Sequence, residues 1–409
     1  MKDSTVIKNI SLATMMLMQF MLVAVWWVPL AAYLTNKGVE GSMKALILSS
    51  MATGSMVSPM IGAFADRYLS AQKVLAVLNL LTALFLLVAG LSNDFLWIFV
   101  SIFIAMLCYM PTWSLTSSIA MTHAKPELFP RIRMFGSIGW ITSGLFSLAA
   151  VKVFKIEVFD GSNIPLFCGS AVAAVAALLN ILTLPDTPPN KSNEKISVRK
   201  LLGLDAFLLL RDRNYRMFIA CSAAAMLAFA LYYSFGSEFL QDRQFKYITV
   251  TMNWGQVVEL FFLFFATTII MRVGLKNALA IGLIALIARY LAFYLGVVSD
   301  VNAYYITGIL FHGLIFGLFF VGGQVYTESK APKNLRAQAQ GMLSFLIWGV
   351  ALLLGNFVCG QLISLNKTVD AAGKAVYDWN TIFAITTVFS VIVAILFYLF
   401  FKQEKRKTS

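Results

Sequence analysis

Charged residues are scarce in this chain of 409 residues: Asp, Glu, Lys and Arg together account for 12% of it, whereas soluble domains carry about 25%. Hydrophobic residues reach 59%, so the composition excludes an ordinary soluble enzyme and a disordered or collagen-like chain. Cysteine is also sparse, and its four copies lie far apart within apolar runs, at Cys108, Cys168, Cys221 and Cys359. This spacing excludes a disulfide scaffold and predicts buried, unpaired thiols.

Enzymatic motifs are missing as well. The sequence contains no Walker phosphate loop, no cluster with zinc-ligand spacing, no nucleophile elbow and no kinase signature. ATP-driven pumping and hydrolysis within the membrane therefore lack the residues they need. We predict that the protein is not an enzyme and uses no cofactor or metal, so that transport would draw on an ion gradient or on the gradient of the substrate.

Long apolar runs are what the sequence has in abundance. A helix that crosses a bilayer takes about 20 apolar residues, and twelve runs of this kind can be distinguished. They lie at residues 9–34, 42–65, 73–92, 96–121, 133–155, 163–184, 216–236, 249–271, 277–297, 303–327, 337–364 and 379–401. The first run is longer than the core of a signal peptide and should stay as an anchor. The sequence thus predicts an all-α integral membrane protein with twelve transmembrane helices.

The net charge of +13 is distributed unevenly across the predicted membrane. With both termini placed in the cytoplasm, 23 of the 32 Lys and Arg residues fall in cytoplasmic segments or at the adjoining span ends and 8 in or beside outer loops, while Arg289 alone lies in the interior of a span. This asymmetry follows the positive-inside rule and favours cytoplasmic termini. Because the basic residues are spread over loops and form no single nucleic-acid-binding module, we expect no nucleic-acid partner.

A cytoplasmic linker at residues 185–215 divides the chain into two predicted six-helix bundles, at 1–184 and 216–409. The linker begins with proline-rich, polar sequence, and residues 201–213 are typical of a short amphipathic helix on the membrane surface. Arg67 follows the second span and Arg272 follows the eighth, 205 residues later. Two parallel six-helix halves with a substrate site between them at mid-membrane are a recurring design of secondary transporters.

Glu259 is the one acid predicted to lie deep inside a span. It shares a helix face with Asn253 and Gln256, because the three recur at every third position. An ionisable group inside a membrane is costly and calls for a role. One interpretation is reversible protonation during transport. The other is a structural ion pair with Arg289, since the two residues lie 15 positions to either side of a predicted turn at Gly274.

Four further side chains are candidates for contact with a polar substrate. Arg133, Ser137 and Trp140 share a face at the start of the fifth span, where an arginine can donate hydrogen bonds and a tryptophan can stack on a ring. The alternatives are an anchoring arginine at the inner boundary and a tryptophan that only packs. His312, in the tenth span, either titrates or donates to a substrate, or else stays neutral and bonds to a backbone carbonyl.

Six motifs follow one another along nearly the whole chain. They are GAFADRYLSA at 62–71, YMPT at 109–112, RMFGSIGW at 133–140, LLGLDAF at 201–207, GLKN at 274–277 and RAQAQGM at 336–342. With these motifs the chain resembles the bacterial nucleoside:proton symporters of the major facilitator superfamily.

The resemblance implies a transporter that imports a nucleoside together with a proton across a Gram-negative inner membrane, as a monomer in the lipid bilayer. It also implies the residues that contact the substrate. These are Arg133, Ser137, Trp140, Gln256, Glu259 and Phe316. In that arrangement Gln256 and Glu259 hold the ribose hydroxyls, while Trp140 and Phe316 present faces to the base.

The chain also departs from the family pattern. Family members carry polar amides on the seventh helix where Ala230 and Tyr233 stand here, an acid at the position of Gly317 and a tyrosine at that of His312. Glu259 is then the predicted proton-coupling residue, with His312 as its assistant and as a substrate contact.

Three functions follow from these observations. The first is a proton-coupled nucleoside importer that works by alternating access. The second keeps the fold and carries another small polar solute: a sugar, a nucleobase or a cell-wall fragment. The third is a membrane-embedded sensor or scaffold, which calls for a soluble effector domain that the sequence does not show.

Overall fold

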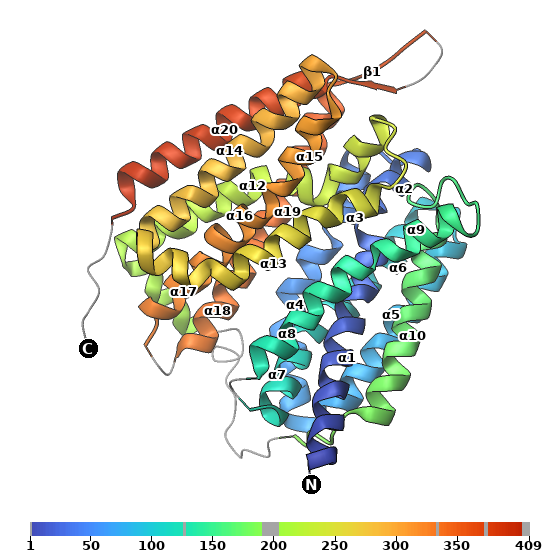
Figure 1. Cartoon of the computed structure of the whole chain (residues 1–409), viewed down its shortest axis with the longest axis vertical. Coiled ribbons are helices and arrows are strands. Elements are labelled where there is room, and N and C mark those ends of the chain that lie inside the picture. The colour runs from blue at the N-terminus through green and yellow to red at the C-terminus, as the bar shows by residue number, and fades with distance from the viewer. Residues whose placement is uncertain (1, 126–127, 190–203, 333–334, 372–374, 403–409) are drawn as a thin grey trace. The chain divides into compact units, whose positions relative to one another are not determined.

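The computed structural model describes residues 2–125, 128–189, 204–332, 335–371 and 375–402, and nearly all of them are helical (Figure 1). The contacts of the backbone divide the chain into two compact units. Unit 1 comprises Met1–Leu202 and Ser234–Asn253, and unit 2 comprises Gly203–Tyr233 and Trp254–Ser409. The division falls inside two helices, α12 (Arg213–Asp242) and α13 (Ile248–Val273).

Unit 1 contains the helices of the first half of the chain and the adjoining ends of α12 and α13. Its own helices are α1 (Lys2–Trp27), α2 (Leu30–Asn36), α3 (Gly41–Leu48), α4 (Ser50–Tyr68), α5 (Ala71–Leu91), α6 (Phe95–Tyr109), α7 (Thr112–His123), α8 (Phe129–Thr142), α9 (Gly144–Lys152) and α10 (Ile164–Thr183). Two of the predicted spans are interrupted by proline, at Pro29 between α1 and α2 and at Pro111 between α6 and α7, because proline has no N–H to donate to the helix.

Unit 2 begins with a short 3₁₀ helix and ends with a long α-helix, α20, which runs beside α14 (Figure 1). Its elements besides α12 and α13 are η1 (Leu204–Arg211), α14 (Leu275–Ser299), α15 (Asn302–Leu310), α16 (His312–Leu314), η2 (Ile315–Phe320), α17 (Val321–Lys330), α18 (Arg336–Ser344), η4 (Phe345–Ala351), α19 (Leu352–Leu365), β1 (Lys367–Val369), β2 (Ala375–Tyr377) and α20 (Trp379–Phe400). The segments η2 and η4 are π-helical. The strands β1 and β2 form an antiparallel hairpin that pairs Thr368 with Val376, where we predicted only a loop.

Eleven stretches of the described residues are long and apolar enough to cross a membrane. Each coincides with one of the twelve predicted spans, so the all-α membrane fold is confirmed, although the count of twelve is not. The remaining predicted span, 42–65, is occupied by α3 and α4. In this region the hydroxyls of Thr53, Ser55 and Ser58 each bond to the carbonyl four residues earlier, which satisfies these polar groups inside the helix.

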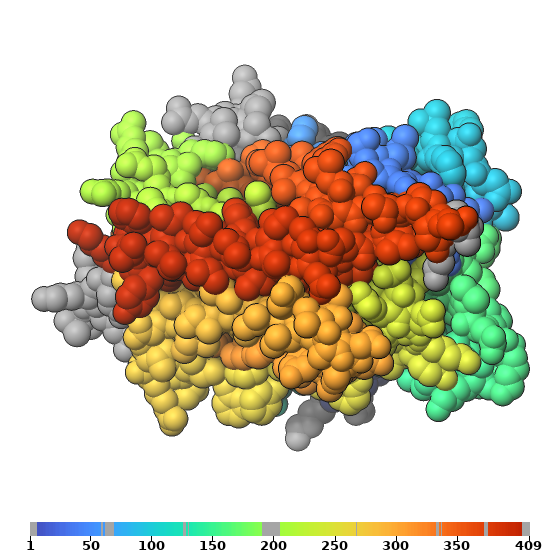
Figure 2. Space-filling model, turned by 90° about the horizontal axis from the view of Figure 1, so that it is seen from above, coloured from blue at the N-terminus to red at the C-terminus, as the bar shows by residue number. Residues whose placement is uncertain are grey.

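The outer faces of the helices are apolar, as a hydrocarbon environment requires. Along α20 the exposed side chains recur every three or four residues, and Figure 2 shows this helix, in red, lying open on one face of the molecule. They are Ile385, Val388, Ile392, Ile395 and Leu399. The helix α5 exposes a comparable stripe of leucines together with Val77. Such stripes are the lipid-facing surfaces of membrane helices, whose backbone bonds are all satisfied internally.

The predicted linker is only partly extended chain. Its first residues pack against the start of α5: the Ala71 N–H donates to the Thr187 carbonyl at 3.0 Å, and the Thr187 N–H donates to Gln72 Oε1 at 2.9 Å. The amphipathic segment 201–213 is described from residue 204 onward, as the 3₁₀ helix η1. The rest of the predicted linker, residues 190–203, lies outside the described part of the chain.

Two predictions about buried groups need correction. Two acids outside the predicted spans are buried as well: Glu238 is 2% exposed and Asp160 is 4% exposed. Glu238 pairs with Lys44, one of the eight basic residues that we counted with the outer loops, and Lys44 is also buried. Partners that compensate the charge or satisfy the oxygens make such burial tolerable. Of the four cysteines, all are unpaired as predicted, but Cys168 is only half-buried.

Candidate functional site

The central feature of unit 2 is a buried contact between three polar side chains of α13 and α16. His312 Nε2 lies 3.2 Å from Glu259 Oε2 and 2.9 Å from Gln256 Nε2. The side chains of His312 and Glu259 are 3% and 8% exposed. Gln256 and Glu259 come together because they are three residues apart on one face of α13. The structure therefore assembles three of the predicted site residues into one cluster.

Two glycines allow the helices to approach closely enough for this contact. A Cβ atom on Gly313 would lie 2.5 Å from the backbone nitrogen of Glu259, and a Cβ atom on Gly255 would lie 2.9 Å from the Cβ of His312. Neither position tolerates a larger residue without a shift of backbone or side chain. The next residues of the same span leave α-helical geometry at η2, as π-helical turns often do near functional sites.

The three polar groups have two arrangements that differ in the position of a proton. When His312 Nε2 carries a hydrogen, it can donate to the Glu259 carboxylate, and the Gln256 amide must turn its oxygen toward it. When Nε2 is bare, it accepts a hydrogen bond from the Gln256 amide nitrogen. His312 Nδ1 is buried and has no hydrogen-bond partner among the described residues. The orientation of Gln256 is thus tied to the protonation of its neighbours.

Aromatic rings surround this cluster. The His312 ring stacks at 5.6 Å from Phe229 and at 5.9 Å from Phe316. Trp348, on η4, adds a third wall at 6.0 Å from Phe316 and 5.7 Å from Tyr233. Sequence reasoning found Phe316 but missed Trp348, because a tryptophan in an apolar span carries no signal that separates a binding surface from packing.

Trp348 also lines a small, partly open recess in unit 2. The recess combines aromatic walls with polar groups, as ligand pockets generally do. Its polar side chains are Ser222, Gln324 and Ser344, and Phe320 and Trp348 are among its rings. The same tryptophan therefore borders both the buried cluster and an accessible hollow.

The other predicted site residues lie in unit 1, on α8. The Arg133 guanidinium stacks 4.2 Å above the ring of Phe20 on α1, which in turn stacks 5.2 Å from Trp113. Ser137 is half-buried. Trp140 is 8% exposed. The structure thus gives Arg133 an aromatic support of the cation–π kind and leaves Trp140 packed within the unit.

The expected ion pair between Glu259 and Arg289 is not formed. Glu259 contacts His312 instead, and Arg289 donates through Nε to the Gly308 carbonyl at 3.2 Å. We counted residues from the turn on the assumption of two regular helices facing each other at equal depth. The histidine of the next span intervenes, because that span approaches α13 at Gly313.

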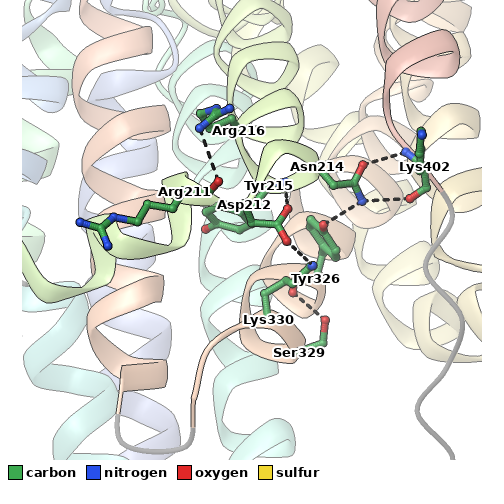
Figure 3. Close-up of polar contacts among 9 residues, drawn as sticks. All are labelled: Arg211, Asp212, Asn214, Tyr215, Arg216, Tyr326, Ser329, Lys330 and Lys402. Atoms are coloured by element: carbon green, nitrogen blue, oxygen red, sulfur yellow. Dashed lines mark hydrogen bonds and ion pairs between the residues drawn. The ribbon is translucent and has the colours of Figure 1, made fainter.

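A second polar cluster of unit 2 lies at the start of α12 (Figure 3). Asp212 and Lys330 form an ion pair of 3.0 Å, and Asn214 bridges the hydroxyl of Tyr326 and the backbone of Lys402. The pKa of Asp212 lies below its usual value: burial acts to raise it, but hydrogen bonds from the Tyr215 N–H and from Lys330 outweigh burial. This cluster ties together the ends of α12, α17 and α20, a structural role.

These features define a class of protein: a multi-pass helical membrane transporter with a buried titratable cluster beside aromatic walls. Among the described residues, no three His, Cys, Asp or Glu side chains gather to hold a metal ion. Residues 7–406 match the family model described as "Nucleoside H+ symporter". The chain therefore belongs to the nucleoside H⁺ symporter family, which consists of transporters and not of enzymes.

Individual relatives agree with this assignment over nearly their whole length. YegT of Escherichia coli (strain K12) is 33% identical over 402 residues, which cover 96% of this chain and 93% of YegT. The nucleoside permease NupG of the same organism is 27% identical over 415 residues, 97% of this chain and 96% of NupG.

Solved structures show the same fold. The crystal structure of the nucleoside transporter NupG superimposes with a TM-score of 0.83 at 26% identity, covering 97% of this chain and 99% of NupG. A POT family transporter superimposes with a TM-score of 0.71 at 14% identity, covering 95% of each chain, which supports the fold alone. The architecture is thus that of the major facilitator superfamily.

Proposed function

We propose that the protein imports nucleosides across a bacterial inner membrane by proton symport. The observation that carries the proposal is the buried contact of His312 with Glu259 and Gln256, in a chain matched by the nucleoside H⁺ symporter model over residues 7–406. A carboxyl and an imidazole in contact inside a membrane can exchange one proton. The adjacent amide can bond to the hydroxyls of a sugar.

Proton binding and nucleoside binding are coupled because both involve the side-chain amide of Gln256. Protonation of Glu259 changes the hydrogen bonds at His312 Nε2 and so decides which end of the Gln256 amide faces the histidine. The other end of the Gln256 amide, oxygen or nitrogen, is then free to bond to the substrate. Proton binding and nucleoside binding are in this way linked by differential contacts, which is what thermodynamic coupling between two sites requires.

The remaining parts of the proposal concern the whole binding surface. Phe316 and Trp348 present faces on which a base can stack. Arg133, Ser137 and Trp140 contribute further contacts, as the family resemblance implies. We also propose that residues 1–184 and 216–409 act as two six-helix bundles joined by the linker 185–215, that they alternate access as a monomer in the bilayer, and that both termini are cytoplasmic.

The test is uptake of labelled uridine, adenosine and inosine by proteoliposomes under an inward acid gradient. Wild-type protein should accumulate at least one nucleoside, and Glu259→Gln should retain downhill exchange while losing gradient-driven accumulation. Glu328→Gln is the matched control, because Glu328 is an acid with a side chain that is 56% exposed. No uptake of any nucleoside would refute the substrate, and undiminished accumulation by Glu259→Gln would refute the coupling.

The alternative cargo, another small polar solute, is distinguished by ligand screening. A solute that binds only the folded protein raises its melting temperature by mass action. Stabilisation by a sugar, a nucleobase or a cell-wall fragment, with none by nucleosides, would favour this alternative. Of the departures from the family pattern, Ala230 is fully buried and faces Gly355 on α19, so that position bears on helix packing and not on the recess.

A further inference from the structure

Arg133 stands at the end of a stacked column of side chains within unit 1. Its guanidinium carbon lies 4.2 Å from the centre of the Phe20 ring, and Phe20 stacks on Trp113 with ring centres 5.2 Å apart and planes inclined by 26°. The three side chains come from α8, α1 and α7. A cation held over the face of a ring is fixed by a contact that uses none of its N–H donors. The column can therefore orient the arginine and leave these donors to other contacts.

Buried hydrogen bonds hold the aromatic part of the column in one arrangement. Trp113 Nε1 donates to the Tyr109 hydroxyl at 2.8 Å, and this hydroxyl donates to the Gln19 carbonyl at 2.8 Å. The side chain of Gln19, which precedes Phe20, exchanges two hydrogen bonds with Asn79 at 3.0 and 3.1 Å. Tyr109, Gln19 and Asn79 are fully buried. Satisfied buried networks of this kind rigidify a core, so the stacked rings form a fixed support.

Gly136 provides the space in which the Arg133 side chain lies. A Cβ atom at Gly136 would lie 2.6 Å from Arg133 Nη1 and 2.8 Å from Phe20 Cδ2, closer than side chains pack without a shift. Gly139, three residues later on the same face of α8, approaches α1 even more closely, because a Cβ atom there would lie 2.1 Å from the Leu17 carbonyl oxygen. The guanidinium thus occupies a slot between α8 and the Phe20 ring.

Phe20 and Arg133 differ in how accessible they are to a substrate. Phe20 is 7% exposed, whereas Arg133 is half-buried. The ring can therefore act on a bound molecule through the arginine that it supports. An arginine in water has many rotamers, and fixing one of them on binding lowers the affinity. A guanidinium that is ordered before the substrate arrives avoids this loss.

We propose that Phe20 is a positioning residue for nucleoside binding, whose ring holds the Arg133 guanidinium ready to donate to paired acceptor atoms of the substrate. The planar fork of an arginine suits two neighbouring acceptors, which nucleobases present as carbonyl oxygens and ring nitrogens. Trp113 and Gly136 complete the support. The inference rests on the proposed function, in which Arg133 contacts the nucleoside.

The experiment measures the KM and the maximal rate of uptake by full-length protein in proteoliposomes, with labelled uridine or whichever solute the wild type accumulates. Phe20→Leu removes the ring and keeps an apolar side chain. We expect KM to rise about fivefold, as loss of a cation–π contact implies, with a maximal rate within about twofold of the wild type. Phe103→Leu is the matched control, because Phe103 pairs with Phe99 at 5.6 Å on α6 and this pair contains no cation. An unchanged KM in Phe20→Leu, or an equal rise in Phe103→Leu, would overturn the inference.

A double-mutant cycle separates positioning from packing. Arg133→Gln should raise KM by itself, and Phe20→Leu should add nothing in the Arg133→Gln background, because a positioning residue acts only through its partner. Equal effects of Phe20→Leu with and without Arg133 would show that the ring packs or binds independently, and would overturn the inference. A wild-type KM in Arg133→Gln would overturn it too, since there would be no contact to position.

Gly136→Ala tests the same arrangement if Phe20→Leu yields no folded protein. The added methyl group displaces the guanidinium, so KM should again rise when Arg133 is present and should not rise further in Arg133→Gln. A wild-type KM in Gly136→Ala would overturn the inference. The two hypotheses fail separately. A wild type that accumulates only another solute defeats the proposed function and leaves the KM test in place with that solute, whereas nucleoside uptake with an unmoved KM in Phe20→Leu defeats only the role of Phe20.

Discussion

At the scale of single residues, the buried polar side chains of the two units differ in how well their polar atoms are hydrogen-bonded. Buried polar groups in proteins are nearly always hydrogen-bonded. In unit 2, His312 Nδ1 is one of several exceptions among the described residues, and its ring shares two aromatic neighbours, Phe229 and Tyr232, with the Arg289 guanidinium.

Asp160 in unit 1 is, by contrast, a buried acid whose carboxyl group has several hydrogen-bond partners. Its carboxyl group is 4% exposed and accepts hydrogen bonds from the Ser147 hydroxyl at 2.9 Å and from the hydroxyl and N–H of Thr249 at 2.6 and 3.3 Å. Burial raises the pKa of Asp160, and these hydrogen bonds only partly oppose the effect. Burial therefore favours the protonated form of this carboxyl group, which joins the loop after α9 to the start of α13.

This pKa predicts a pH-dependent stability. Because the pKa is higher in the folded state than the ordinary value of 3.8, the contribution of Asp160 is complete below that value and is lost as pH rises through the folded-state pKa. Each unit of the difference corresponds to about 1.4 kcal/mol. Melting curves between pH 4 and 9 should show the wild type losing stability relative to Asp160→Asn as pH rises. Parallel curves would contradict the prediction.

Asp378 supplies a control of opposite sign. It caps α20, and hydrogen bonds from the side chain and N–H of Thr381 hold its pKa below the ordinary value. Its contribution is therefore present above pH 3.8 and is lost on acidification. Asp378→Asn should lower the melting temperature slightly at neutral pH and leave it unchanged in acid.

At the scale of secondary-structure elements, the candidate site depends on interrupted helices. The tenth predicted span is divided into α15, α16, η2 and α17, and the eleventh contains η4 between α18 and α19. The π-helical segments carry Phe316 and Trp348, respectively. An extra residue in a turn rotates the side chains that follow it, so that rings from two spans can converge on one surface.

A buried ion pair joins two helices in unit 1. Lys44 Nζ on α3 lies 2.7 Å from Glu238 Oε1 on α12 and also donates to the Thr35 hydroxyl at 2.8 Å. Both side chains are at most 4% exposed. In so dry a site, removal of one partner leaves an uncompensated charge, whereas removal of both leaves none.

The pair predicts a non-additive pattern of stability. Lys44→Met alone should destabilise the protein by about 3–5 kcal/mol, and the double variant Lys44→Met/Glu238→Met should recover most of the loss. Melting temperatures in detergent, followed by tryptophan fluorescence, measure both. The exposed pair of Lys246 and Glu157, 3.5 Å apart, is the control: Lys246→Met should change stability by less than about 1 kcal/mol. A double variant as unstable as Lys44→Met would refute the interpretation.

At the scale of the whole molecule, charge asymmetry predicts orientation. With 23 of the 32 Lys and Arg residues on the side of the termini, the positive-inside rule places both termini in the cytoplasm and the β1–β2 hairpin outside. A cysteine at Asp370 in the hairpin should react with a membrane-impermeant maleimide in intact cells, and a cysteine at Ser409 only after permeabilisation. The unmodified protein gives the background from its four native thiols. The reverse labelling pattern would exclude this orientation.

Much of the architecture could be predicted from local properties of the sequence. A run of about 20 apolar residues has few alternatives to a membrane helix, so eleven of the predicted spans recur in the structure. The polar stripe of Gln256 and Glu259 could be predicted because residues three apart on a helix always share a face. Family membership followed from short motifs, since it depends on residue identity and not on geometry.

Partnership between distant residues could not be predicted in this way. That Glu259 contacts His312 and leaves Arg289 to two aromatic rings depends on how closely two helices approach at Gly313 and on the phase shift at η2. Likewise, Lys44 belongs to the interior only because Glu238 meets it there. Periodicity states which face of one helix a side chain occupies; only packing in three dimensions sets what that face meets, and therefore which charges are neutralised and which remain available for function.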